Sequence, residues 1–232
     1  MVYIENPVPA KIVRKMNRFL CRVLTGKGET SAHIPNSGRL TELLTPGAQA
    51  LLEPSTNPER KTRYTLRSVK YGGRWVCVDS SVPNRVAERM VESGKWTMFA
   101  GYRVKRREAT IGHHRFDLLL EGAGKKPMIV EVKSATLVNG DTAMFPDAPT
   151  ERGKSHVEYL AELLDEGYDC AVLFVIGRSG VARFTPNAAT DPGFAASLKA
   201  AWLAGVKVMA VTCAVGERTI HAAVEIPVAW DG

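Results

Sequence analysis

The sequence predicts two domains, a small, strongly curved β-barrel over residues 1–82 and an α/β domain with a mixed sheet flanked by helices over residues 83–232. One observation behind this fold class is a series of short strand-like segments, broken by turns, in the first third of the chain. Another is the alternation of strand-like and helix-like segments in the remainder. The length of 232 residues suits either one large domain or two small ones.

Strand-like segments of the N-terminal region follow one another with only short turns between them. Residues 11–24 alternate apolar and basic side chains, and Gly72-Gly73 forms a hairpin turn between two later strands. Short strands joined by tight turns are typical of an OB-like barrel. Aromatic side chains of such a barrel either pack inside it or stack on nucleic-acid bases. For Tyr64, Tyr71 and Trp75 we expect packing.

The basic excess of the chain is concentrated in the N-terminal region. The net charge is +7, and residues 1–82 contain 13 Lys and Arg against 6 Asp and Glu, so the remainder is neutral as a whole. A basic surface attracts polyanions by releasing counterions, without reading their sequence. Arg14, Arg18, Arg63 and Arg67 are therefore expected to contact nucleic acid. The alternative is charge that only keeps the domain in solution.

A helix followed by a β-hairpin opens the second domain. The helix is expected to begin near Pro83 with Asn84 as its N-cap and to end near Gly94. Apolar residues then alternate with polar ones on both sides of a Gly- and Pro-containing turn within residues 115–133, which predicts two antiparallel strands.

Two carboxylates and a lysine are expected to converge on this hairpin. Glu131 and Lys133 are two residues apart on a strand and therefore share one face, and Asp117 on the partner strand can face them. Mg²⁺, or Mn²⁺, prefers carboxylate oxygens and can stabilise charge on a phosphodiester undergoing hydrolysis. Asp117 and Glu131 are thus candidate metal ligands, and Lys133 a candidate base or charge stabiliser. The alternative is a solvated Glu–Lys salt bridge.

The second half of this domain is expected to begin with a polar loop over residues 135–149 and a helix from Thr150 to about Gly167. Arg152 and His156 lie one turn apart on that helix and hence on the same face. There they could bind phosphate or assist proton transfer, although such a pair is often only surface decoration.

The last part of the chain predicts a parallel crossover. Residues 170–176 form a continuous apolar run, a helix from Asp191 to Leu203 follows, and residues 206–215 form the next strand. A final strand covers residues 219–228. These strands and the hairpin together give the mixed sheet.

Several classes of protein are excluded by composition. The four cysteines are scattered, without a CxxC pair or zinc-site spacing, and are expected to be structural. No apolar run approaches the roughly 18 residues of a membrane span. The N-terminal segment lacks the pattern of an export signal, so we expect a cytoplasmic protein with no membrane partner.

The Asp117 and Glu131-x-Lys133 set resembles the D…(D/E)xK signature of the PD-(D/E)xK nucleases. Residues 33–40 (HIPNSGRL), 131–137 (EVKSATL) and 145–156 (FPDAPTERGKSH) are similar to three blocks of the bacterial and archaeal sugar fermentation stimulation family. That resemblance covers the whole chain and implies an OB-like domain, a nuclease-like domain and DNA binding. It also implies a phosphate contact for Arg39, while Asn36 could either hold the turn or touch the sugar. The nuclease resemblance implies a further metal carboxylate on the helix before the hairpin, Glu88 or Glu92, of which we favour Glu88; the alternative is that both are solvated helix charges.

These expectations lead to two function hypotheses. The first is a DNA-binding, Mg²⁺-dependent nuclease that uses Asp117, Glu131, Lys133 and His156, with no organic cofactor. The second is a non-catalytic, sequence-nonspecific DNA-binding regulatory protein linked to sugar (maltose) metabolism, as the family name implies. In both, the DNA contacts are assigned to Arg14, Arg18, Asn36, Arg39, Arg63, Arg67 and Arg152. The oligomeric state stays open, with a homodimer as one alternative.

Overall fold

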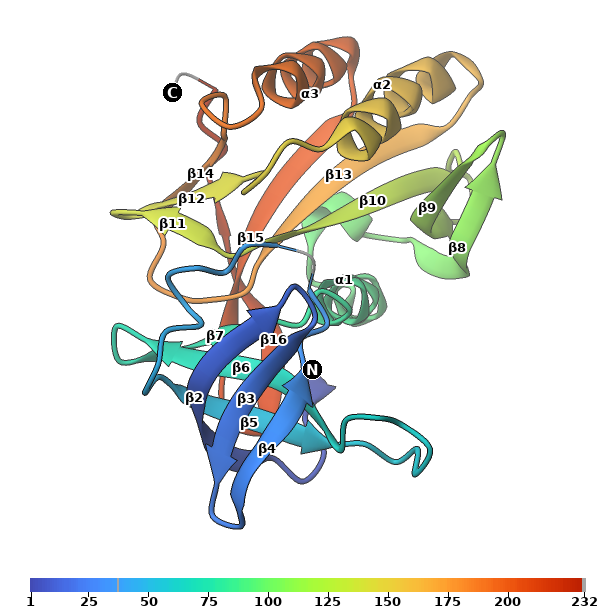
Figure 1. Ribbon diagram of the computed structural model, residues 1–232. Coiled ribbons are helices and arrows are strands. Elements are labelled where there is room, and N and C mark those ends of the chain that lie inside the picture. Colours follow the sequence, from blue (N-terminus) through green and yellow to red (C-terminus); the bar gives the residue numbers. More distant parts are fainter. Residues whose placement is uncertain (37, 231–232) are drawn as a thin grey trace.

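The computed structural model describes residues 1–36 and 38–230 and contains a β-barrel below an α/β domain (Figure 1). The barrel strands are β2 (Val8–Asn17), β3 (Leu20–Thr25), β4 (Gly28–His33), β5 (Gln49–Pro54) and β6 (Tyr64–Tyr71). They pair in the order β4-β3-β2-β5-β6, and a parallel pairing of β4 with β6 closes the barrel. β7 (Arg74–Cys77) follows β6 through the expected Gly72-Gly73 turn and pairs antiparallel with it. This is the predicted OB-like barrel.

The described part of the α/β domain is built on a seven-stranded mixed sheet in the order β1-β16-β15-β13-β10-β9-β8. Its strands are β1 (Val2–Tyr3), β8 (Arg103–Ile111), β9 (His114–Glu121), β10 (Met128–Ala135), β13 (Asp169–Ile176), β15 (Lys207–Val215) and β16 (Thr219–Ile226). β10, β13 and β15 run parallel, and β9 and β16 are antiparallel to their neighbours. The predicted hairpin, crossover and fold class are confirmed.

Helices cover both faces of this sheet (Figure 1). α1 (Val82–Ser93) packs on one face, and α2 (Glu151–Asp165) and α3 (Pro192–Ala204) pack on the other, each with its own apolar core. A short 3₁₀ turn (Thr97–Phe99) follows α1. The expected cap of α1 was wrong: Ser81 is at the N-cap position, and Asn84 lies inside the first turn. The side chain of Asn84 is therefore free to serve a different purpose.

The expected polar loop over residues 135–149 was also wrong. It contains β11 (Leu137–Asn139) and β12 (Thr142–Phe145), which form a small sheet with β14 (Arg183–Pro186). Local sequence gives little sign of it, because β12 pairs in parallel with a strand about forty residues later.

The first strand belongs to the second domain in space. β1 pairs with β16, and the side chains of Val2 and Ile4 are buried in the core shared with α1. The sequence-based division at residue 82 had assigned this segment to the barrel.

All four cysteines are buried free thiols, as expected for structural residues. No helix within residues 1–36 and 38–230 has the length and apolar character needed to cross a membrane.

Candidate active site

Asp117 lies where the β9–β10 pairing stops being regular. The antiparallel register runs from Met128↔Leu120 to Val130↔Leu118. Beyond it, the Val132 N–H donates to Asp117 Oδ2 at 2.7 Å, so a side chain replaces the next ladder contact. The strands separate here and leave room above β10.

The second oxygen of Asp117 is held by α1. Asn84 Nδ2 donates to Asp117 Oδ1 at 2.6 Å. Burial raises the pKa of Asp117 to about 6, the negative charge of Glu131 adds to the rise, and the two hydrogen bonds and Lys133 oppose it. The carboxyl group is thus positioned by two donors and still costly to ionise.

Glu131 is buried, and its two oxygens differ. Oε1 accepts hydrogen bonds from Lys133 Nζ at 2.6 Å and from His156 Nδ1 at 2.8 Å. Oε2 is buried with no hydrogen-bond partner in the described part of the chain. Burial alone would raise the pKa of Glu131, but the hydrogen bond from His156 and the charge of Lys133 outweigh it and lower that pKa. Glu131 is therefore an ionised carboxylate with one oxygen available.

The first turns of α2 supply a histidine and an arginine. Thr150 caps the helix by accepting the Gly153 N–H at 3.1 Å, which fixes where the helix begins. Arg152 Nε donates to His156 Nε2 at 3.3 Å. With its proton on Nδ1, His156 accepts from Arg152 and donates to Glu131, so the expected one-turn spacing links α2 to β10.

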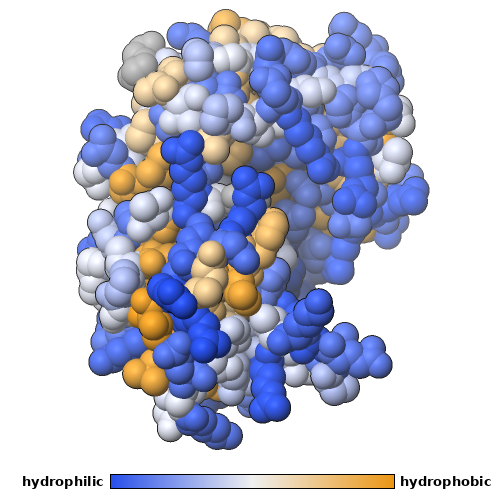
Figure 2. Space-filling view, viewed as in Figure 1, coloured by the Kyte–Doolittle hydropathy of each residue, from blue (hydrophilic) through white to orange (hydrophobic). Residues whose placement is uncertain are grey.

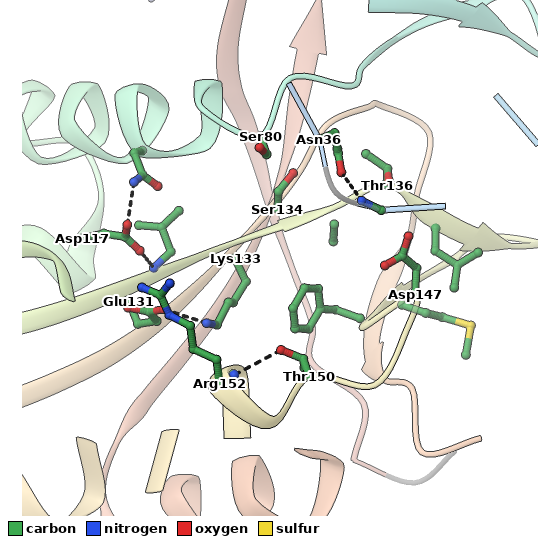
Figure 3. Close-up of a pocket in the computed structure, with 18 residues that line it drawn as sticks. Asn36, Ser80, Asp117, Glu131, Lys133, Ser134, Thr136, Asp147, Thr150 and Arg152 are labelled. Atoms are coloured by element: carbon green, nitrogen blue, oxygen red, sulfur yellow. Dashed lines mark hydrogen bonds and ion pairs between the residues drawn. The ribbon is translucent and has the colours of Figure 1, made fainter. Parts of the chain in front are cut away.

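A cavity of about 420 Å³ opens beside these groups, between the two domains (Figure 3). Asp117 and Glu131 lie toward one end, Asn36 and Asp147 toward the other, and Lys133 between them, while the Arg152 side chain extends from α2 toward the Glu131 end. Hydroxyl side chains contribute much of the remaining lining, namely Ser80, Ser134, Thr136 and Thr150. Its chemistry suits a polar, hydrogen-bonding ligand.

The barrel contributes Asn36 and Gly38 to this cavity; Ser37 lies outside the described residues. Asn36 Nδ2 donates to the Val78 carbonyl at 2.9 Å, and Asn36 Oδ1 accepts the Gly38 N–H at 2.7 Å. Asp147 Oδ2 accepts the Arg39 N–H at 2.9 Å. A Cβ on Gly38 would lie 2.6 Å from that oxygen, so a larger residue here would have to displace the Asp147 carboxylate.

Two family models match consecutive parts of the chain. The one described as the SfsA N-terminal OB domain matches residues 13–78, and the one described as the sugar fermentation stimulation protein RE domain matches residues 81–219. The chain belongs to the sugar fermentation stimulation protein family.

Relatives within the family match nearly the whole chain. A sugar fermentation stimulation protein homolog of Caldanaerobacter subterraneus subsp. tengcongensis is 40% identical over 219 residues, covering 94% of this chain and 95% of its own length. One from Methanothermobacter thermautotrophicus is 38% identical over 232 residues, covering 99% and 96%. A solved structure of Pyrococcus furiosus SfsA in complex with Ca²⁺ is 30% identical, with a TM-score of 0.90 over 98% of both chains.

The residues of this family member fit a hard divalent cation. Asp117 and Glu131 supply two carboxylates, and Mg²⁺ commonly binds one or two carboxylates while keeping several waters. Glu131 Oε2 is a buried acceptor without a donor among the described residues, and such an atom calls for a ligand. The described residues contain no group of three or more His, Cys, Asp or Glu side chains placed to hold a metal.

The expected third carboxylate is not at this site. Glu88 lies on α1, is largely buried, and pairs with Arg107 Nε at 2.6 Å. It does not line the cavity. Asn84, one turn earlier, is the α1 residue that reaches Asp117. Sequence reasoning had used Asn84 as a cap and so missed it, and it missed Asp147 although a family block contains that residue.

The residues assigned to nucleic acid divide into three groups. Asn36 and Arg152 line the cavity. Arg14, Arg18, Arg39 and Arg63 are exposed and form no ion pair with other described residues. Arg67 is different: it is paired with Glu53 and with the fully buried Asp79, so it ties the barrel to the segment before α1 and is not presented to a ligand.

Proposed function

We propose that this protein is a divalent-cation-dependent nuclease that hydrolyses phosphodiester bonds of DNA in the cavity between its domains. The observation that carries this proposal is the buried carboxylate of Glu131. One of its oxygens accepts hydrogen bonds from Lys133 and His156, while the other has no partner among the described residues, and Glu131 lines the cavity together with Asp117.

Asp117 and Glu131 would hold the cation, Mg²⁺ or Mn²⁺. A relative that is 30% identical over nearly its full length has been solved in complex with Ca²⁺, another hard cation that takes oxygen ligands. A bound cation supplies Lewis-acid polarisation of a phosphate oxygen and a water of lowered pKa. The raised pKa of Asp117 supports this role, because a carboxylate whose charge is poorly compensated gains most from a nearby cation.

The remaining side chains would act on the phosphodiester and on the attacking water. The Lys133 ammonium is held in place by Glu131 Oε1 and lines the cavity, where it can orient the water or stabilise charge that develops on the phosphoryl group. Arg152 offers a guanidinium for the phosphate. His156 fixes the orientation of Glu131 through Nδ1.

DNA is proposed as the substrate because the barrel carries the basic excess. Arg14, Arg18, Arg39 and Arg63 are exposed cations with no carboxylate partner in the part of the chain described. Such groups contribute affinity for a phosphate backbone regardless of sequence.

The test is cleavage of labelled DNA by the wild type, Lys133→Ala and Asp117→Asn over a series of Mg²⁺ and Mn²⁺ concentrations, with binding measured in the same tubes. Lys126→Ala, an exposed lysine in the turn of the same hairpin, is the matched control. We expect both site variants to lose at least about a hundredfold in rate while retaining DNA affinity, in line with the loss of one preorganised charge stabiliser. Equal rates for wild type and Lys133→Ala would refute the proposal.

The second candidate is a non-catalytic, sequence-nonspecific DNA-binding regulator linked to sugar metabolism. The unpaired arginines of the barrel favour it as much as they favour a nuclease. Salt-dependent binding without cleavage under any of these cations would select it.

A further inference from the structure

Phe19 is a solvent-exposed aromatic side chain on a basic surface of the barrel. It lies in the turn between β2 and β3, directly after Arg18, and is 51% exposed. Its backbone is fixed on both sides: the Phe19 N–H donates to Asn17 Oδ1 at 2.9 Å, and its carbonyl accepts the Ile34 N–H at 2.8 Å. An exposed ring on a rigid turn is preorganised to bind a flat apolar group.

His33 lies beside Phe19 at the end of β4. The two rings are nearly parallel, with an interplanar angle of 24° and centroids 6.5 Å apart. Partial burial lowers the pKa of His33, and the charges of Arg60 and Arg67 lower it further, so the imidazole is neutral at pH 7. Two neutral ring faces therefore occupy the same edge of the barrel.

Cations border this pair of rings. Thr65 at the start of β6 pairs with His33, so the loop over residues 55–63 leaves the barrel close to the rings. That loop projects in Figure 1 and is covered by hydrophilic side chains in Figure 2. It carries the exposed Lys61 and Arg63, and Arg18 adjoins Phe19 on the other side.

The same edge leads to the candidate active site. Asn36, which lines the cavity, follows His33 by three residues. Lys15 of β2 donates from Nζ to the Arg39 carbonyl at 2.6 Å, which ties the β2–β3 hairpin to the rim of the cavity.

We propose that Phe19 and His33 form a stacking site for the bases of a single-stranded nucleic acid, which the cations Arg18, Lys61 and Arg63 hold by its phosphates. The inference rests on the proposed function and specifies its substrate: bases in a duplex are stacked on each other, so an aromatic ring on the protein surface can stack only on an unpaired base. The three aromatic residues considered from sequence are engaged elsewhere: Tyr64 packs against the barrel core, Tyr71 lies against Arg178, and Trp75 lies against Lys70.

The test uses fluorescence anisotropy with the full-length protein and labelled oligonucleotides of about 15 nucleotides, within the site size of one OB fold. Single-stranded and duplex forms are compared at several salt concentrations in EDTA, so that cleavage does not interfere. We expect Phe19→Ala to weaken single-strand binding about tenfold, the range of one base–aromatic stack, without changing the salt slope. Arg18→Ala should reduce the slope, because it removes a phosphate contact.

Two further variants separate stacking from structure. Phe19→Trp keeps a stacking face and should retain affinity. Leu24→Ala removes another exposed apolar side chain of the same barrel, 49% exposed near the opposite end of β3, and should bind like the wild type. A single-stranded probe containing 2-aminopurine should be quenched by the wild type and not by Phe19→Ala.

The outcomes distinguish this inference from the proposed function. Unchanged single-strand affinity in Phe19→Ala, or a wild type that binds duplex alone, would overturn the stacking site and leave the nuclease proposal intact. If Phe19 contributes to single-strand binding as expected but the wild type cleaves nothing in Mg²⁺, the stacking site would stand and the nuclease proposal would fall.

Discussion

Asp117 and Glu131 are neighbouring carboxyl groups whose pKa values shift in opposite directions. Burial raises the pKa of Asp117, whereas His156 and Lys133 overcome burial at Glu131 and lower its pKa. Catalytic sites typically shift the pKa values of neighbouring groups apart in this way, and structural ion pairs can do so too. Glu131 therefore carries its negative charge throughout the neutral pH range, whereas the charge of Asp117 changes with pH near 6.

This arrangement predicts that Asp117 costs stability in the cation-free protein at neutral pH. Its pKa in the folded chain, about 6, lies above the ordinary 3.8, so the folded state binds more protons between these values. The stability contributed by this group is greatest below about pH 4 and is lost as pH rises through 6. In EDTA, we expect the stability of Asp117→Asn relative to wild type to rise by about 2 kcal/mol from pH 4 to pH 7. A pH-independent cost is added, because asparagine keeps only one of the two acceptors that Asn84 and Val132 use.

Urea unfolding at several pH values measures this difference. Asp141→Asn is the control, because Asp141 is an exposed carboxylate paired with Arg183 at the surface. A stability difference for Asp117→Asn that stayed constant from pH 4 to pH 7 would contradict the raised pKa.

At the scale of elements, Asp191 connects the beginnings of two helices. Its Oδ1 accepts the Phe194 N–H at 2.9 Å and caps α3, while Oδ2 accepts the Thr150 N–H at 2.8 Å, just before α2. Since Arg152 and His156 lie in the first turns of α2, one buried carboxylate stabilises α3 and also fixes the position of two site residues.

Asp191→Ala is therefore expected to lower the free energy of unfolding by about 2 to 4 kcal/mol, through loss of a cap and a buried N–H left unpaired. Asp191→Asn, which keeps one acceptor, should lose about half as much. Asp165→Ala, an exposed substitution at the end of α2, should stay within roughly 0.5 kcal/mol of wild type. Thermal and urea unfolding decide this, and equal losses for Asp191→Ala and Asp165→Ala would contradict the double contact.

The success of sequence reasoning also varies between elements. The β9–β10 hairpin could be predicted because strand alternation is local, and the same alternation placed Glu131 beside Lys133. α3 could be predicted from Asp191 and Gly205 at its ends. The β11–β12 hairpin could not, since its partner β14 is remote in sequence. Asn84 was missed because a residue in the first turn of a helix is easily taken for its cap, and only the position of β9 shows that its amide reaches Asp117.

At the scale of the whole molecule, the two domains are joined at more places than the division at residue 82 suggests. The segment with Asn36 and Gly38 meets Asp147, and β1 completes the sheet of the second domain. In the sequence the barrel is thus inserted between β1 and α1, which pack together in one core. The cavity has walls from both domains, so its shape depends on their staying together.

Val2→Ala/Ile4→Ala tests how much the first strand contributes. Both side chains are at most 5% exposed, in the core with α1 and β16. Truncating both should lower the stability of the second domain by about 2 to 4 kcal/mol, since Val and Ile lose buried methyl groups and leave cavities. Tyr3→Ala is the control, because Tyr3 is 57% exposed. Hydrogen exchange should quicken in β16 and remain unchanged in β3; faster exchange in β3 alone would contradict the assignment of β1.

The pairing of β1 with β16 also sets the order in which the two domains can fold during synthesis. Val2 pairs with Ile220, so the first strand has no partner until a strand more than two hundred residues later has been made. The barrel can fold early, since its strands are complete by residue 77. The sheet that carries the carboxylates cannot gain β1 at its edge until β16 has been made. A chain released early would therefore present a finished barrel attached to an open sheet edge, the kind of exposed edge that invites aggregation and proteolysis.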